Sequence, residues 1–365
     1  MCDEVRTVII DNGSGIVKGG FGGDLSPLIK EPCCVGQGKD NLRSFSTGET
    51  ESPISDGVIN IDDMKTIWDR IFANLDHDHP VRPSEHPILM TEPIRNPPKN
   101  KENLVELLFE TYSTPKFLIA NDCVLGVFGS GRITGFALDC GENLTQFAPV
   151  YEGHTITYAT IRQAYGGKQL TEAFRTLLQR DHSYAYEHTF EQLNYSELKE
   201  KHCFVCQNFE IAMNSARQQL EMQHKDQNEL TIPDIIGISP VRFKTGEILF
   251  NPSFDLKQLK IFPLDQACYF SIQNIDYELR KSMYSNIVLS GGTTMLPGLN
   301  DRLKLILKSY APPTNEVNVI ASPQRLNGAW VGGSLLSSMA SFQQMLISKG
   351  EYNEVGKSII HRKSL

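Results

Sequence analysis

The N-terminal part of the sequence reads Val8-Ile9-Ile10-Asp11-Asn12-Gly13-Ser14-Gly15-Ile16-Val17-Lys18, and a related stretch follows at Phe136-Ala137-Leu138-Asp139-Cys140-Gly141-Glu142-Asn143. Each stretch is typical of a β-strand that runs into a tight turn containing glycine, with an aspartate where the strand ends. Glycine has no Cβ and tolerates positive φ, so backbone N–H groups in such a turn can approach an anion closely. The two turns are therefore candidate phosphate cradles.

The charged residues of these stretches suggest a cation beside the phosphates. Hydrated Mg²⁺ keeps most of its waters and takes one or two carboxylates together with phosphate oxygens. Asp11 and Asp139 are candidates for that role, and Lys18 is placed to reach the β- and γ-phosphates as a point charge. Short turns of this composition also close ordinary hairpins, which is the alternative for either copy alone. The copies lie about one domain length apart, so two similar lobes can each supply one turn.

The composition is that of an ordinary globular protein. The chain has 365 residues, a hydrophobic content of 40% and a formal net charge of -8 at pH 7. It has no long basic run, so direct binding to nucleic acid is not expected. Neither a secretory signal pattern nor an apolar run of roughly 18 residues is present, so we expect no membrane insertion. The eight cysteines then indicate reduced thiols in the cytoplasm, with the nucleus as the alternative compartment.

Two short clusters invite a metal interpretation. Cys203 and Cys206 form a CxxC motif after His202, but the sequence has no second CxxC to complete a four-ligand site. The same residues belong to an apolar series with helical spacing, which predicts that Ser196–Met222 forms the longest helix. The Asp-His-Asp-His segment at 76–79 precedes prolines, which favours a solvated loop.

Further motifs follow the first turn along the chain. They comprise Asp11–Gly15 with Lys18 and Gly19–Phe21, Trp68, Thr91-Glu92, Leu108–Thr111, Ser130–Arg132, Tyr151–Gly153, Leu170-Thr171, Lys199–Lys201, Leu289–Met295, Trp330–Ser334, Ile347–Lys349 and His361–Lys363. In this series the chain resembles actin and the actin-related proteins over nearly its whole length. From its sequence it is identified as a divergent member of that family.

The resemblance implies an α/β fold of the actin-like ATPase type. Two similar lobes with duplicated mixed sheets should surround a nucleotide cleft, and the alternation of strands with amphipathic helices agrees with this. The core of the first lobe is expected in residues 1–32, 53–129 and 328–365, with a shortened insert at 33–52. The core of the second lobe is expected in residues 130–165 and 258–327, with an insert at 166–257.

The resemblance also implies which residues hold ATP or ADP with Mg²⁺. Asp11 and Asp139 would hold the metal through water. The implied phosphate and nucleoside contacts are Gly13, Ser14, Gly15, Lys18, Gly141, Glu142, Asn143, Gly167, Lys199, Glu200, Gly292, Thr293, Met295 and Leu326. Asn143 replaces a family glycine, and asparagine tolerates the left-handed conformation well. Leu326 replaces a family lysine beside the base, so a polar contact is lost and weaker nucleotide binding is expected.

Both residues of the family's hydrolytic pair are substituted. Ungapped matching places the family's water-orienting glutamine at Asp122 and its proton-relay histidine at Gln146. A carboxylate can accept a proton, yet it adds negative charge beside the triphosphate. A glutamine can orient water but cannot relay a proton near neutral pH. Slow or absent ATP hydrolysis is the favoured expectation. The alternative is an active ATPase in which Asp122 is the general base or an additional Mg²⁺ ligand.

Two loops that serve in the family's filaments also differ here. The loop Gln37–Ser52 is shortened and polar, so it offers little apolar surface for insertion into a neighbouring subunit. The segment Asp255–Gln266 is slightly longer and includes Ile261 and Phe262, which makes it a candidate interaction site. We expect weak self-assembly and a role as a cytoskeletal or complex-forming subunit. Its partners would be proteins, among them other actin-family subunits, and a nuclear subunit of a chromatin complex is the alternative.

Overall fold

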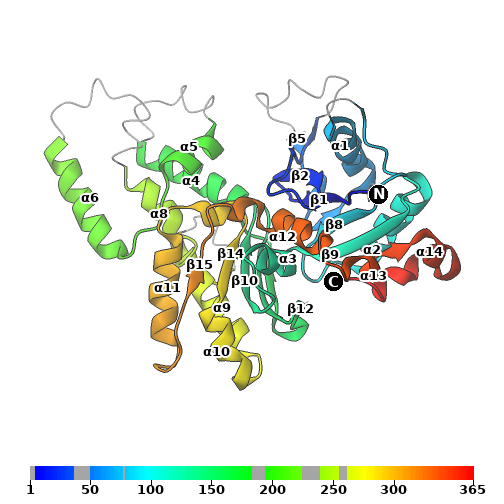
Figure 1. Ribbon diagram of the computed structural model, residues 1–365. Coiled ribbons are helices and arrows are strands. Elements are labelled where there is room, and N and C mark those ends of the chain that lie inside the picture. The colour runs from blue at the N-terminus through cyan, green and yellow to red at the C-terminus, as the bar shows by residue number, and fades with distance from the viewer. Residues whose placement is uncertain (1–4, 37–49, 77–78, 183–193, 224–238, 255–260) are drawn as a thin grey trace.

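The computed structural model describes residues 5–36, 50–76, 79–182, 194–223, 239–254 and 261–365. Figure 1 shows two halves side by side, each built around its own sheet. Helices α3 (Asp122–Gly129) and α12 (Gly328–Ser337) lie where the halves meet. The expectations for Gln37–Ser52 and for the first part of Asp255–Gln266 fall largely outside the described residues.

The first sheet is mixed and has the strand order β16-β9-β8-β1-β2-β3. Strand β1 pairs antiparallel with β2 and parallel with β8, and β8 pairs parallel with β9. The strands are β1 (Val8–Asn12), β2 (Ile16–Phe21), β3 (Ile29–Pro32), β8 (Ile88–Glu92), β9 (Lys116–Asn121) and β16 (Ile347–Ser348). Strand β8 is buried along its whole length, as expected where both faces of a sheet are covered.

The second sheet repeats this arrangement with the order β12-β11-β10-β14-β15, and β13 also pairs with β11. Strand β10 pairs antiparallel with β11 and parallel with β14, and β14 pairs parallel with β15. The strands are β10 (Gly135–Cys140), β11 (Thr145–Tyr151), β12 (His154–Thr155), β13 (Ile161–Gln163), β14 (Ile287–Ser290) and β15 (Val319–Ile320). The prediction of duplicated mixed sheets is thereby confirmed. The lobe boundaries given above stay a prediction.

The remaining elements are helices and two small hairpins. The other helices are α1 (Ile61–Asn74), α2 (Pro98–Glu106), α4 (Gly167–His182), α5 (Tyr195–His202), α6 (Phe209–Gln223), α8 (Val241–Glu247), α9 (Leu264–Gln273), α10 (Tyr277–Ser285), α11 (Leu299–Tyr310), α13 (Phe342–Met345) and α14 (Lys349–Val355). A π-helical turn, Leu107–Thr111, continues α2, and the hairpins pair β4 (Val35–Gly36) with β5 (Thr50–Glu51) and β6 (Ile54–Ser55) with β7 (Val58–Ile59). Helix α1 buries Met64, Ile67, Trp68, Ile71 and Phe72, the stripe that a period of 3.6 residues produces.

Glycines allow α3 and α12 to pack with their backbones in contact. A Cβ at Gly129 would lie 2.4 Å from the carbonyl oxygen of Gly328. Helix α3 begins directly after β9, and the side chain of Asn121 caps it by accepting hydrogen bonds from the backbone N–H groups of Cys123 and Val124. The cap and the close packing fix Asp122, the first residue of α3, at the junction of the two halves.

The predicted long helix Ser196–Met222 is wrong. Helix α5 ends at His202, α6 begins at Phe209, and among the described residues the longest helix is α4, with 16 residues. Between α5 and α6 the backbone turns to other partners, since the Val205 N–H donates to the Pro297 carbonyl at 2.8 Å. The close approach of neighbouring backbone at this point overrides the helical spacing of the apolar residues.

Candidate functional site

The turn between β1 and β2 is held by its own backbone and by α1. The Gly13 N–H donates to the Asp11 carbonyl at 3.0 Å, and a Cβ at Gly13 would lie 2.4 Å from the Ile16 carbonyl oxygen. Trp68 Nε1 donates to the side-chain oxygen of Asn12 at 2.9 Å. Only glycine fits at position 13 without moving the turn.

Asp11 lies at the base of this turn in a buried ion pair. Its Oδ2 is 2.7 Å from Nζ of Lys18, the residue opposite it on β2. Its Oδ1 accepts a hydrogen bond from Thr91 Oγ1 at 3.0 Å. Asp11 and Lys18 are 6% and 7% exposed, so the attraction between their charges is screened little by solvent. Asp11 and Lys18 are both expected at this position from the sequence, whereas the sequence assigns no role to Thr91.

The turn between β10 and β11 is clamped by two other segments. The Gly141 carbonyl accepts hydrogen bonds from the Gly167 N–H at 3.0 Å and from Thr293 Oγ1 at 2.8 Å. The Glu142 carbonyl accepts from the Lys168 N–H at 2.9 Å. The turn is therefore tied to the start of α4 and to the 3₁₀ turn Gly292–Met295. These bonds bring residues from distant parts of the sequence to one place.

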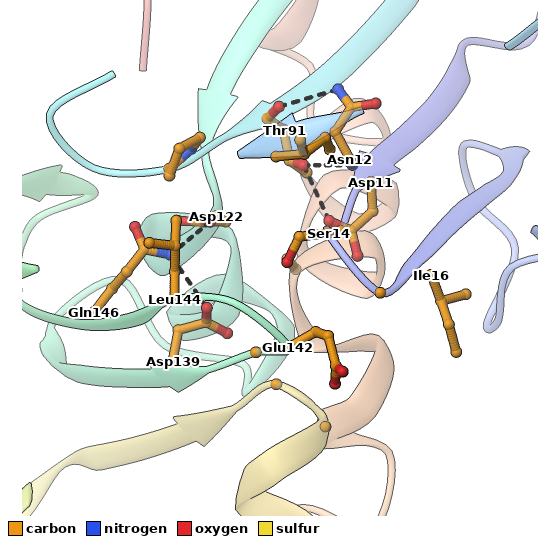
Figure 2. A pocket seen from close by; sticks show the side chains of 18 of the residues that line it. Asp11, Asn12, Ser14, Ile16, Thr91, Asp122, Asp139, Glu142, Leu144 and Gln146 are labelled. Carbon is orange, nitrogen blue, oxygen red and sulfur yellow. Dashed lines mark hydrogen bonds between the residues drawn. The ribbon is translucent and has the colours of Figure 1, made fainter. Parts of the chain in front are cut away.

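The two turns meet across the junction. The Asn143 N–H donates to Ser14 Oγ at 3.2 Å, and Asn143 Nδ2 donates to the Ile54 carbonyl at 3.4 Å. A Cβ at Gly15 would lie 2.9 Å from the Cβ of Glu142. In Figure 2, Asp11 and Ser14 come from the first hairpin, and Asp139 and Glu142 from the second. The arrangement predicted from the sequence, with one turn from each lobe facing the other, is present.

The floor of the junction holds the carboxyl groups of Asp122 and Asp139, which are joined by the side-chain amide of Gln146. Gln146 Nε2 donates to Asp122 Oδ2 at 2.8 Å and to Asp139 Oδ2 at 3.2 Å, as Figure 2 shows. Gln146 Oε1 accepts from the Ile94 N–H at 2.7 Å. Asp122 Oδ1 accepts from the Cys123 N–H at 2.7 Å.

Burial raises the pKa of both carboxyl groups. The pKa of Asp122 lies well above its usual range, because burial and then the neighbouring Asp139 carboxylate disfavour its charge. Burial likewise raises the pKa of Asp139, although hydrogen bonds from Ser290 and Gln146 oppose the shift. Ser290 Oγ donates to Asp139 Oδ1 at 2.7 Å. The floor of the junction therefore disfavours a negative charge on either group unless a cation lies nearby.

A cavity of about 350 Å³ lies between the turns, within the size range of small-molecule sites, roughly 300–1,000 Å³. Of the residues expected at the site, those that line it are Asp11, Gly13, Ser14, Gly15, Lys18, Asp122, Asp139, Gly141, Glu142, Gln146, Lys199, Glu200, Gly292, Thr293, Met295 and Leu326. Asn143, which belongs to the second turn, and Gly167, which bonds to that turn, are not among its lining residues. Lys199 Nζ, on α5, donates to the Gly167 carbonyl at 2.9 Å and so fixes the start of α4.

Several lining or supporting residues had no role assigned from the sequence. Thr91 and Ser290 each bond one of the aspartates, and Glu92 and Arg325 line the cavity. Thr91 and Ser290 lie near the carboxyl ends of β8 and β14, the parallel neighbours of β1 and β10. Ligands of open α/β sheets bind beyond the carboxyl ends of the strands, so this position was the available signal.

The residues present suit a hydrated Mg²⁺ with phosphate groups. Carboxylate oxygens are the ligands that Mg²⁺ takes in proteins, and the glycine positions leave room for phosphate oxygens near the backbone. No three His, Cys, Asp or Glu side chains of the described residues are arranged to hold a metal directly. The donor set therefore fits a cation held through water or shared with phosphates.

Cys203 and Cys206 are both buried thiols, and burial raises the pKa of Cys203 to about 12.

The chain was also compared with models of protein families. In the described part of the chain, no helix is both long and apolar enough to cross a bilayer. The model of the Actin family matches residues 2–365, which is almost the whole sequence. The paired hairpins, the mixed sheets and this match agree, and the chain belongs to the actin family.

Proposed function

We propose that this chain binds a magnesium complex of ATP or ADP between its lobes and acts as a structural subunit of protein assemblies. One observation carries the proposal: two glycine turns, one from each sheet, face each other over a cavity whose floor holds Lys18 and three aspartates. Glycine turns, a lysine and carboxylates are the groups that hold nucleotide phosphates with Mg²⁺.

Each part of the cavity has its own role in the proposal. Backbone N–H groups at Gly13, Ser14 and Gly15 would contact phosphate oxygens, and Lys18 would exchange part of its attraction to Asp11 for the phosphates. Asp11 and Asp139 would hold Mg²⁺ through water. At the other end of the cavity, the nucleoside would contact Lys199, Glu200, Gly292, Thr293, Met295 and Leu326. The loss of the family lysine at Leu326 supports weaker binding of the base.

We infer that hydrolysis is slow or absent. Attack of water on a γ-phosphate needs a group that positions the water and accepts its proton. The side chain of Gln146 is engaged by Asp122, Asp139 and Ile94, and both oxygens of Asp122 already accept protein hydrogen bonds. These contacts favour a structural role for Asp122 and Gln146 over a catalytic one. The second candidate is an ATPase in which Asp122 is the general base.

The surface around Phe262 supports the proposed role in assembly. The Phe262 side chain is 53% exposed and makes an edge-to-face contact with Phe270, at 6.3 Å between ring centroids. Its backbone is fixed, since the Phe262 N–H donates to Gln163 Oε1 at 3.1 Å. An aromatic side chain held at the surface in this way is a candidate contact for a protein partner.

We propose that the protein acts in the cytoplasm as a cytoskeletal component.

Equilibrium titration of the full chain with a fluorescent ATP analogue in Mg²⁺ tests the nucleotide part of the proposal. Saturable binding that unlabelled ATP displaces, and that Lys18→Met weakens at least about tenfold, is the expected result, because a charge-assisted contact contributes about 1.5–3 kcal/mol. Equal affinity in the parent and in Lys18→Met would show that the phosphates do not lie where we place them.

A further inference from the structure

The hairpins of the two lobes place their key residues in the same register. Lys18 lies opposite Asp11 in the first hairpin, and Gln146 lies opposite Asp139 in the second. The side chains follow the register, with Lys18 Nζ 2.7 Å from Asp11 Oδ2 and Gln146 Nε2 3.2 Å from Asp139 Oδ2. Directly opposite residues on neighbouring strands interact through their side chains. Gln146 is thus the second-lobe counterpart of Lys18, but it carries no charge.

The amide of Gln146 also reaches the other lobe. The amide donates its second hydrogen to Asp122, and its oxygen accepts a hydrogen bond from the Ile94 N–H. Asp122 follows β9 and Ile94 follows β8, and both strands belong to the first sheet. Glutamine has two amide hydrogens and one carbonyl oxygen, and each of them is used here. The side chain is 1% exposed, so water does not replace these partners. One neutral residue therefore joins two carboxylates and two lobes.

The two carboxyl groups bonded by this amide differ from Asp11 in their charged partners. Asp11 has Lys18, whereas in the described residues no Lys, Arg or His forms an ion pair with Asp122 or Asp139. Buried carboxylates are normally paired with a cation or coordinate a metal. Both line the cavity between the two turns, so the cation of a bound nucleotide would be the charge that reaches them.

We propose that Gln146 is a positioning residue that holds Asp122 and Asp139 side by side, so that both carboxylates face the cation of the nucleotide complex. Asp122 then adds a carboxylate from the first lobe to the cation site, and the bond network of Gln146 links cation binding to the contact between the lobes. This inference rests on the proposed nucleotide site. Without the cation the carboxylates repel phosphates, and with it they help to retain them.

The ratio of two nucleotide affinities measures this coupling. The Kd of ATP is determined for the full chain in excess EDTA and in excess Mg²⁺, and the first value is divided by the second. Gln146→Met keeps the shape of the side chain and removes its hydrogen bonds. Loss of a residue that orients metal ligands lowers metal affinity by about 10- to 100-fold, so the ratio should fall by that factor. Gln273→Met is the matched control, since Gln273 is half-buried and bonded to Arg280 away from the cavity.

Asp122→Asn separates positioning from a general loss of structure. It should lower the ratio in the same way, and combining it with Gln146→Met should lower the ratio less than the two single effects predict, because both act on one carboxylate. A parent-like ratio in folded Gln146→Met, or additive effects, would overturn the proposal. If Gln146→Met does not fold, a parent-like ratio in Asp122→Asn overturns it alone. A parent chain that binds no ATP in Mg²⁺ would instead contradict the proposed function.

Discussion

Gly332 of α12 passes so close to Leu125 of α3 that a Cβ on Gly332 would lie 1.8 Å from the Leu125 carbonyl oxygen. No side chain fits at that distance, and the obstacle is backbone that cannot rotate away. The contact holds together α3, which begins at Asp122, and α12, which begins two residues after Leu326, so it positions both ends of the candidate site.

Gly332→Ala should therefore destabilise the fold by at least about 3 kcal/mol, the upper part of the cost of overpacking. Gly328→Ala on the same helix is the control, because its Cβ would meet Ser290 Cβ at an ordinary 3.4 Å. Urea unfolding of both variants gives the comparison. Equal free energies of unfolding for Gly332→Ala and the parent would mean that α3 and α12 are not packed as described.

The C-terminal part of the fold gives a pH-dependent prediction. Hydrogen bonds from Lys363 and then from Ser348 lower the pKa of Glu351 to about 2, and Ser348 and Glu351 form a capping box at the start of α14. In an unfolded chain the pKa of glutamate is about 4.3. The lowered pKa therefore stabilises the fold fully above about pH 4.3, and this contribution is lost as the pH falls through about 2.

Glu351→Gln should lower the free energy of unfolding at pH 7 by less than about 1 kcal/mol, because the carboxylate is partly exposed and its ion pair is screened. The difference from the parent should shrink as the pH is lowered from 5 to about 3. Urea unfolding at each pH, with Glu354→Gln on the same helix as the charge-matched control, measures it. A difference that is independent of pH would contradict the role given to Glu351.

Restoring the family's hydrolytic pair should speed phosphate release. Asp122→Gln with Gln146→His supplies a residue that orients water and one that accepts a proton, a kind of assistance that contributes about 10²–10⁴ in rate. Single-turnover phosphate release is measured for the parent, both single variants and the double variant. A parent faster than the double variant would favour Asp122 as a working base and rule out the proposal of slow hydrolysis.

Self-assembly should be weak, and Phe262 should matter for partners rather than for nucleotide. Association must overcome several kcal/mol of lost translational and rotational freedom, and we expect the shortened loop to offer little apolar surface. Sedimentation of the purified chain with Mg-ATP should leave it in the supernatant. Ile261→Asp with Phe262→Asp should disrupt a partner complex and leave ATP affinity unchanged. Long two-stranded filaments of the pure parent in electron micrographs would refute weak assembly.

Much of the fold could be predicted from local patterns. The strands predicted before the two glycine turns correspond to β1 and β10. Their apolar runs end in turn residues, which is a local signal. The break between α5 and α6 could not be predicted in this way, because a hydrogen bond from Val205 to distant Pro297 decides it.

The candidate site could likewise be predicted only in part from the sequence. Aspartates and glycines of the two turns could be predicted because the turn chemistry is written in consecutive residues. The partners of Gln146 could not, since Asp122, Asp139 and Ile94 come together only when both sheets and both lobes are in place. From the sequence, Gln146 could orient water but not relay a proton, and its hydrogen bonds suggest a positioning role.

The central claim is that Mg-ATP binds between the lobes, and unfolding in the presence of nucleotide tests it most directly. At about 100-fold excess over Kd, a ligand that binds only the folded state stabilises it by about 2.7 kcal/mol. The account predicts this shift for the parent and for Lys65→Ala, whose lysine is half-buried on α1 and pairs with Asp69. Lys18→Ala and Asp139→Ala should lose most of the shift. A shift of parental size in both of these variants would contradict the assignment of the cleft.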